Sequence, residues 1–162
     1  MTSGLVLGRA LERAGLDFFT GVPDSTLAGL FAWLERSPDY VAAASEELAV
    51  GLAVGAYLGG RSPAVLMQCS GLGRTVNALA SLACLYRIPL LLVIGWRGHD
   101  GNDAPEHLLQ GRATPALLDA LEVPFAVLET SCPEAGVERA MALLRERRLP
   151  AGLLVRPGTL HG

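Results

Sequence analysis

The stretch Tyr40–Gly60 reads Y-V-A-A-A-S-E-E-L-A-V-G-L-A-V-G-A-Y-L-G-G, and the fold can be built outward from it. Its first part, Tyr40–Ala44, predicts a short buried strand. Its second part predicts a helix that has Ser45 as its N-cap and ends at Gly59-Gly60. No charged side chain occurs from Leu48 to Leu58, so we expect this helix to be buried on all its faces.

Two charges do occur in this segment, Glu46 and Glu47, both in the first turn of the predicted helix. Acidic residues are common in a first turn because the helix N-terminus carries partial positive charge, a contribution of roughly 0.3–1 kcal/mol. Two glutamates are more than this dipole requires, and their surroundings are apolar. The local pattern therefore leaves two interpretations open, a partner for the helix dipole or a catalytic carboxylate.

Composition limits the classes of protein to consider. The chain has 162 residues, 51% of them apolar, which is enough for one domain with a hydrophobic core. Its net charge of −3 gives no reason to expect nucleic-acid binding. We expect no membrane span and no signal peptide, because the apolar runs are short and the N-terminus lacks a basic-then-apolar pattern. Cys69, Cys84 and Cys132 have no metal-binding spacing and cannot all pair, which suits a reducing cytoplasm.

Predicted strands and helices alternate along the chain. Besides residues 40–44, strands are predicted at Asp17–Val22, Ala64–Gln68, Pro89–Gly95, Pro124–Leu128 and Gly152–Val155. Helices are predicted from a Ser3 cap to Gly15, around Leu27–Leu34, after the Cys69–Gly73 turn to about Leu85, from Thr114-Pro115, and after Ser131–Glu134, which has capping-box spacing. This order predicts an α/β fold, an open six-stranded parallel sheet with helices on both faces.

Ligands of open parallel sheets bind at the carboxyl ends of the strands. That rule brings Asp24, Glu46, the Ser70–Gly73 turn and the polar loop Trp96–Ala113 to one edge of the sheet. The glycine turn could hold a phosphate, because such turns expose backbone N–H groups before a helix. It lacks the third glycine of a dinucleotide fingerprint, and no Gly-Lys-Ser/Thr follows, so by itself it is better interpreted as a tight packing turn.

Several motifs in a fixed order resemble a known family. They are Phe19-Thr20-Gly21-Val22-Pro23-Asp24-Ser25, Glu46-x-x-Ala49, Gln68-Cys69-Ser70-Gly71-Leu72-Gly73, Ile94-Gly95-Trp96-Arg97-Gly98 and Gln110-Gly111-Arg112. Together they resemble the pyrimidine-binding (PYR) domain of thiamine-diphosphate-dependent decarboxylases and acetolactate-synthase-like enzymes. Within that group the likeness is greater to phosphonopyruvate and sulfopyruvate decarboxylases, and it extends from about Leu5 to Pro157.

The resemblance implies roles for individual residues. Glu46 would hydrogen-bond N1′ of the cofactor's aminopyrimidine and favour the imino tautomer that activates thiamine diphosphate. Asp24 and His107 are implied as further catalytic residues, although Asp24 could also be a simple helix cap. The remaining implied residues are Ser70, Gly71, Leu72, Gly73 and Asn77 for the cofactor, and Arg97, Gln110 and Arg112 for the substrate. Any of the loop cations could instead be solvated or contact a partner subunit.

The resemblance also implies a partner. Enzymes of this kind hold Mg²⁺ and the diphosphate through a second domain marked by Gly-Asp-Gly, and this sequence contains no Gly-Asp-Gly. We therefore expect residues 1–162 to be one PYR domain with no metal ligand of its own, the α subunit of a two-chain enzyme whose β subunit supplies the diphosphate-binding domain. Contact between two α subunits is expected as well.

The implied reaction is decarboxylation of a small anionic 2-oxo acid, 3-phosphonopyruvate or 3-sulfopyruvate, to CO₂ and an aldehyde. Two alternatives stay open at this point. One is a carboligase subunit of the acetolactate-synthase type. The other is a non-catalytic subunit that regulates an enzyme or binds a nucleotide through the glycine turn.

Overall fold

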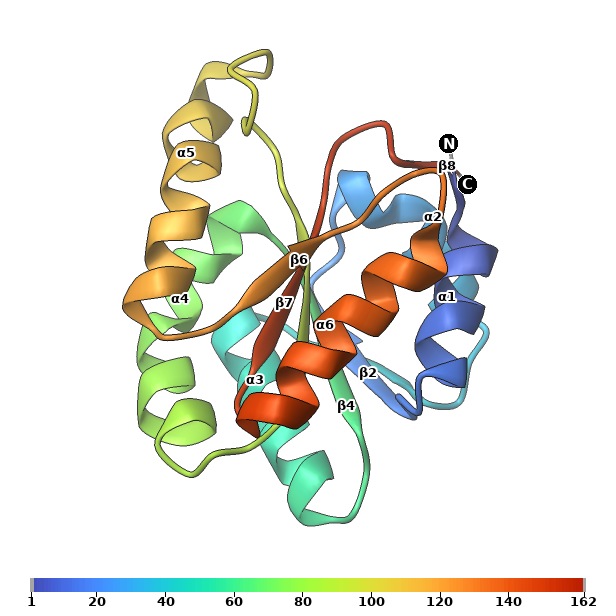
Figure 1. The fold of residues 1–162 in the computed structure, drawn as a ribbon, viewed down its shortest axis with the longest axis vertical. Coiled ribbons are helices and arrows are strands. Elements are labelled where there is room, and N and C mark those ends of the chain that lie inside the picture. The colour runs from blue at the N-terminus through green and yellow to red at the C-terminus, as the bar shows by residue number, and fades with distance from the viewer. Residues whose placement is uncertain (1, 162) are drawn as a thin grey trace.

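Six parallel strands form the central sheet of the computed structural model, which describes residues 2–161 (Figure 1). The strands lie in the order β3-β2-β4-β5-β7-β6. Their bounds are β2 Phe18–Gly21, β3 Tyr40–Ala42, β4 Pro63–Gln68, β5 Leu91–Gly95, β6 Phe125–Val127 and β7 Ala151–Val155. Every neighbouring pair is parallel, which confirms the predicted open six-stranded sheet. A separate parallel pair that was not predicted, β1 (Thr2–Ser3) with β8 (Leu160–His161), joins the two ends of the described chain.

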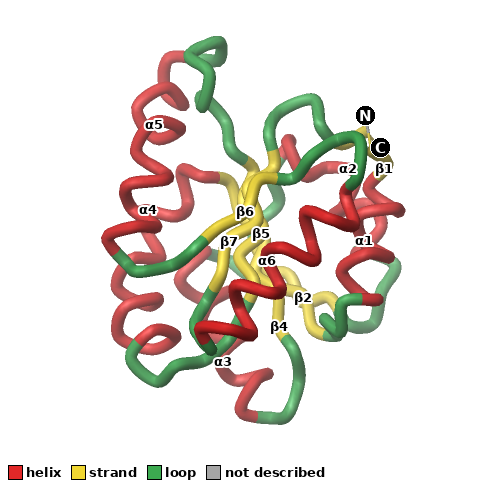
Figure 2. The backbone as a smooth tube through the Cα atoms, viewed as in Figure 1, coloured by secondary structure: helices red, strands yellow, loops and turns green. Residues whose placement is uncertain are grey.

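Helices cover both faces of the sheet, as predicted (Figure 2). One face is covered by α1 (Gly4–Arg13), α2 (Ala28–Leu34) and α6 (Pro133–Arg147). The other is covered by α3 (Glu46–Leu58), α4 (Cys69–Ala78), the π-helical turn η2 (Leu79–Cys84) and α5 (Pro105–Ala120). A short 3₁₀ turn, η1 (Ser25–Leu27), precedes α2. No helix within residues 2–161 has the combined length and apolarity needed to cross a membrane.

The two-residue repeat of the strands divides the core into two layers. Leu66 of β4 and Val93 of β5 belong to the cluster under α1, α2 and α6. Their neighbours Met67 and Ile94 belong to the opposite cluster under α3, α4 and α5. All four side chains are fully buried, as expected for central strands of a parallel sheet covered on both faces.

Two of the three predicted N-terminal helix caps are present, and the third is not. The hydroxyl of Ser3 accepts a hydrogen bond from the Val6 N–H, and that of Ser45 accepts one from the Leu48 N–H, both at 3.4 Å. The predicted capping box at Ser131 is wrong. Helix α6 begins at Pro133 with Cys132 as its N-cap, and proline favours the first helical position because its fixed φ is already helical.

Two expectations of burial in the opening stretch are also wrong. Strand β3 is half-buried to exposed, because it lies at the edge of the sheet with β2 as its one neighbour. Helix α3 buries Ala49, Val50 and Ala53 but leaves Leu48 and Leu58 47% and 74% exposed. In the single chain, one face of α3 packs on the core and its opposite, uncharged face is exposed to solvent.

The polar loop after β5 is shorter than predicted, because α5 begins at Pro105 and not at Thr114-Pro115. Pro115 lies inside the helix, where it has no N–H to give to the carbonyl of Gly111 four residues earlier. The indole Nε1–H of Trp96 donates to that carbonyl instead, at 2.8 Å. The side chain of Trp96 thus compensates for the proline and ties the loop to the helix.

This compensation can be measured with a double-mutant cycle. We expect Trp96→Phe to lower the free energy of unfolding, about 1 kcal/mol of it from the lost hydrogen bond and the rest from lost packing. Pro115→Ala restores a backbone N–H to the helix, so Trp96→Phe should cost about 0.5–1 kcal/mol less in that background. Urea unfolding of the four proteins tests this, and equal costs in both backgrounds would disprove the compensation.

Candidate functional site

Asp24 lies at the carboxyl edge of the sheet, just beyond β2, and is 6% exposed. It occupies the N-cap position of η1, but its side chain makes no capping hydrogen bond. Its Oδ1 accepts from Gln68 Nε2 at 3.0 Å, and its buried Oδ2 has no hydrogen-bond partner among the described residues. Oδ2 fills the space that a Cβ on Gly95 would need, so a larger residue at position 95 would displace the Asp24 carboxylate. The helix-cap interpretation of Asp24 is therefore wrong.

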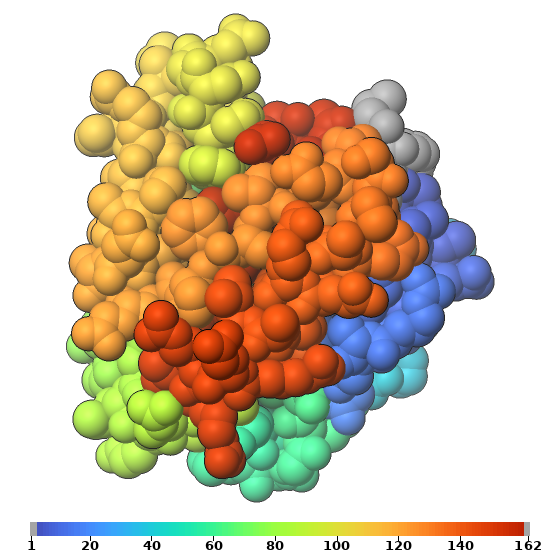
Figure 3. All heavy atoms as spheres, in the orientation of Figure 1, coloured from blue at the N-terminus to red at the C-terminus, as the bar shows by residue number. Residues whose placement is uncertain are grey.

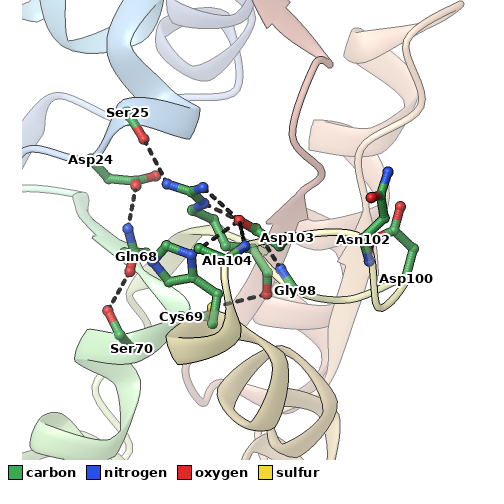
Figure 4. Close-up of polar contacts among 12 residues, drawn as sticks. Asp24, Ser25, Gln68, Cys69, Ser70, Gly98, Asp100, Asn102, Asp103 and Ala104 are labelled. Carbon is green, nitrogen blue, oxygen red and sulfur yellow. Dashed lines mark hydrogen bonds and ion pairs between the residues drawn. The ribbon is translucent and has the colours of Figure 1, made fainter.

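Gln68 links Asp24 to the start of α4 (Figure 4). Its Oε1 accepts from the Ser70 hydroxyl at 2.6 Å, which fixes the amide so that its NH₂ group faces the Asp24 carboxylate. The sequence suggested a glycine turn here, but Gln68 is both the last residue of β4 and the N-cap of α4. Residues 70–73 therefore belong to the first turns of a helix and not to a separate turn.

Glu46 opens α3 and packs against α4. Its side chain is 14% exposed, and its Cγ and Oε1 lie 2.5 Å from the position that a Cβ on Gly71 would occupy. Glycine at position 71 thus leaves the room that the Glu46 carboxyl group takes up. Arg74 makes a loose ion pair with it, with 3.7 Å between Nε and Oε2.

Glu47 differs from its neighbour in exposure and in partners. Its side chain is 45% exposed, and its Oε2 lies 3.4 Å from Nε of Arg74. A hydrogen bond from its own backbone N–H, together with the Arg74 guanidinium, lowers the pKa of this carboxyl group. Glu47 therefore fits the helix-dipole interpretation, and Glu46 is the more enclosed of the two carboxylates.

Asp103 is the centre of the loop between β5 and α5, and sequence reasoning missed it. Its carboxylate accepts from Arg97 Nε at 3.1 Å and Nη2 at 2.6 Å, and from the backbone N–H groups of Gly98 and Ala104 at 2.9 and 2.8 Å. Nδ1 of His107 lies 3.1 Å from Oδ1. The pKa of Asp103 lies well below its usual range, chiefly because Arg97 donates hydrogen bonds to its carboxylate.

Arg97 connects this loop to the Asp24 side of the edge. Its Nη1 lies 3.4 Å from the Ser25 hydroxyl, which adjoins Asp24 (Figure 4). Its backbone carbonyl accepts from the Cys69 thiol at 3.4 Å. Figure 3 shows the loop and the start of α5, coloured yellow, standing out from the rest of this face.

The chain is similar to known proteins in sequence and in fold. Residues 1–122 match the family described as thiamine pyrophosphate enzyme, N-terminal TPP binding domain. The chain belongs to this family.

Relatives of this TPP-binding domain are decarboxylases by name. The sulfopyruvate decarboxylase subunit alpha of Methanococcus maripaludis is 36% identical over 127 residues, covering 77% of this chain and 76% of that protein. The subunit of the same name from Methanocaldococcus jannaschii is 38% identical over 126 residues, covering 76% and 75%. The phosphonopyruvate decarboxylase of Streptomyces viridochromogenes is 35% identical over 155 residues, covering 93% of this chain but 39% of that protein.

A solved structure of low sequence identity has the same fold. The 2-oxoglutarate:ferredoxin oxidoreductase from Magnetococcus marinus aligns with 98% of this chain and 29% of its own, with a TM-score of 0.66 and 16% identity. This likeness supports the α/β fold assigned to the TPP-binding domain.

The structure brings together some of the predicted site residues of this TPP-binding domain and leaves others apart. Asp24 and Ser70 are linked through Gln68. Arg97 and His107 are linked through Asp103, and Arg97 also reaches Ser25, the residue that follows Asp24. Leu72 is fully buried in the core, so it could offer a ligand its backbone alone. Glu46 packs against Gly71, as described above. The other four predicted residues are exposed on helix surfaces, Gly73 and Asn77 on α4 and Gln110 and Arg112 on α5. Among residues 2–161, no group of three His, Cys, Asp or Glu side chains is placed to hold a metal ion.

The Gln68 link can be tested through stability. Gln68→Leu leaves the buried Asp24 carboxylate without its donor, so we expect it to lower the free energy of unfolding by about 1–3 kcal/mol. Ser70→Ala removes the other hydrogen bond of the same amide at a half-buried position and should cost less, about 0.5–1.5 kcal/mol. Urea unfolding of both variants provides the comparison, and a Gln68→Leu variant as stable as the wild type would contradict the link.

The Asp103 contacts should depend on pH. Because the pKa of Asp103 is lowered in the folded chain, its contribution to stability is complete well above the ordinary aspartate pKa of about 3.9 and is lost as the pH falls below it. We therefore expect Asp103→Asn to be less stable than the wild type at neutral pH, with a difference that shrinks in acid. Thermal unfolding of both proteins across this range measures it, and a constant difference would rule out the ionised carboxylate as its cause.

Proposed function

We propose that this chain is the α subunit of a two-chain thiamine-diphosphate-dependent decarboxylase of 3-sulfopyruvate or 3-phosphonopyruvate, which releases CO₂ and an aldehyde. The position of Glu46 carries the proposal. An enclosed carboxyl group at the start of α3 faces a glycine of α4, at the strand edge where open parallel sheets bind ligands. Family membership and the names of the relatives support the same conclusion.

Thiamine diphosphate, when bound, supplies the carbon that adds to the 2-oxo acid. Its ring accepts the electrons that are left when CO₂ departs. The contribution of this chain is to hold the aminopyrimidine. Glu46 would share a proton with a ring nitrogen, and its low exposure keeps water from competing for that proton. The first turns of α4, residues 70–73, would lie along the ring, and Gly73 leaves open space there because no atom lies within 4 Å of an added Cβ.

The substrate would lie toward the loop between β5 and α5. Asp24 and His107 are the proposed catalytic groups on that side, and Arg97, Gln110 and Arg112 are the proposed contacts for the carboxylate and the sulfonate or phosphonate. Arginine suits such oxyanions because its planar fork can donate two hydrogen bonds at once. In support, Arg97 and His107 meet at Asp103, and Arg97 also reaches Ser25 beside Asp24.

A β subunit would complete the site with the diphosphate- and Mg²⁺-binding domain. Helix α3 and the adjoining η2 expose large apolar side chains, which are suited to subunit contact: Leu48, Leu58, Leu82, and beyond η2 Leu85 and Tyr86. We assign this surface to contacts with the β subunit and with a second α subunit, in the cytoplasm. The isolated chain is then expected to show no turnover.

A pair of adjacent substitutions tests the proposal. In the chain co-expressed with its β subunit, Glu46→Gln should lower kcat by about 100-fold or more, because it removes the acid–base group. Glu47→Gln changes the same charge in the same helical turn at an exposed position, and it should stay within about threefold of the wild type.

Cofactor-dependent CO₂ release from 3-sulfopyruvate and 3-phosphonopyruvate is the measurement, and the products are identified with and without an acceptor aldehyde. A Glu46→Gln complex with the wild-type rate would refute the role of Glu46. Release of CO₂ by the purified chain alone would refute the need for a partner. A condensation product in place of the aldehyde would favour the carboligase alternative.

A further inference from the structure

Asp103 forms more hydrogen bonds than a loop needs to hold its shape. Its carboxylate receives four, two from the guanidinium of Arg97 and two from backbone N–H groups, and Nδ1 of His107 lies within hydrogen-bond distance of it as well (Figure 4). The side chain is 8% exposed. The two side chains that it contacts are both among the proposed catalytic or substrate-binding groups, and Asp103 belongs to neither group.

We propose that Asp103 is a positioning residue that fixes the ring tautomer of His107 and leaves one end of the Arg97 guanidinium available. The proposal deepens the proposed function, on which its catalytic part rests. The structural part, the state of the His107 ring, stands independently of any reaction.

The tautomer follows from the chemistry of the acceptor. An ionised carboxylate has no proton to donate, and the Arg97 contact keeps Asp103 ionised across the usable pH range. Nδ1 of His107, 3.1 Å from Oδ1, must therefore carry a proton in this contact. In the neutral ring Nε2 is then the nitrogen with the free lone pair, and it alone can exchange a proton with a ligand.

The orientation of Arg97 follows from the same contact. Asp103 occupies the edge of the guanidinium formed by Nε and Nη2, while Nη1 lies near Ser25. A substrate oxyanion could therefore meet Arg97 from the Nη1 end, next to Asp24. One edge of the Arg97 guanidinium is therefore already hydrogen-bonded to Asp103 and is not available to the substrate.

The loop that carries Asp103 packs closely against α5. Gly98 has a φ of +68°, and a Cβ at this position would overlap the carbonyl group of His107. A Cβ on Gly111 would overlap the carbonyl groups of Arg97 and Gly98. The loop and the first turns of α5 therefore touch through Gly98 and Gly111, which lie before and after Asp103 in the sequence.

The test reads the His107 ring directly. The chain contains three histidines, so two-bond ¹⁵N–¹H correlation spectra of the labelled full chain can be assigned with single substitutions. At about pH 8, well above the ordinary histidine pKa of about 6.5, we expect His107 in the wild type to show the Nδ1–H tautomer. Asp103→Asn should move it toward the Nε2–H tautomer, because an amide can turn its NH₂ group to the ring.

Asp100→Asn is the matched control. Asp100 lies in the same loop but is exposed, and it accepts a hydrogen bond from the Asn102 N–H. The control should keep the wild-type tautomer. An Nε2–H tautomer in the wild type, or a spectrum unchanged by Asp103→Asn, would overturn the inference, and the wild-type spectrum decides the tautomer even if that variant fails to fold.

The catalytic part is read in the complex with the β subunit. Asp103→Asn should lower kcat about tenfold or more through His107 and also raise KM through Arg97, with Asp100→Asn close to the wild type. Wild-type rates for Asp103→Asn would overturn this part. If no 2-oxo acid is turned over by any complex, the proposed function fails, while the spectra still decide the role of Asp103 in the loop.

Discussion

The common direction of the six strands is the constraint on which the site depends. Parallel strands end at one edge of a sheet, so the segments that follow β2, β4 and β5 must meet there. Residues far apart in the chain are in contact as a result. Asp24 lies 44 residues from Gln68, and Ser25 lies 72 residues from Arg97, yet each pair is in hydrogen-bond contact. The two buried layers on either side of β4 and β5 hold this edge in place.

The features that sequence could predict are those set by local or periodic signals. Local signals predicted the alternation of strands and helices along the chain, the Ser3 and Ser45 caps and the helix end at Gly59-Gly60. The structure has all of them. The pair Pro105-Glu106 also fits a helix start, but the prediction placed the start of α5 at Pro115, because a proline inside a helix normally disrupts it. A tryptophan nineteen residues earlier supplies the missing donor. Such compensation is visible only in three dimensions.

The same reasoning explains which site residues were predicted and which were missed. Asp24 and Glu46 follow strands, and the rule for strand ends finds them. Asp103 and Gln68 act on other side chains, so neither stands out by type or spacing. The one available signal for Asp103 was its position just before a Pro-Glu helix start, a pattern shared by many ordinary turns. The burial of α3 was overestimated because an uncharged helix fits a protein interior and a subunit contact equally well.

The charges at the edge indicate what this chain supplies to an anionic ligand. Arg97 is paired with Asp103, and Arg74 lies beside Glu46 and Glu47. Asp24 adds a buried carboxylate with one oxygen that has no hydrogen-bond partner among the described residues. Charges that already have partners attract a further anion weakly, because their fields largely cancel beyond a few ångströms. Under the proposed function, Arg97 and Arg74 would therefore orient the ligand through hydrogen bonds and shape, and more of the positive charge would come from Arg112, the other chain and its metal ion.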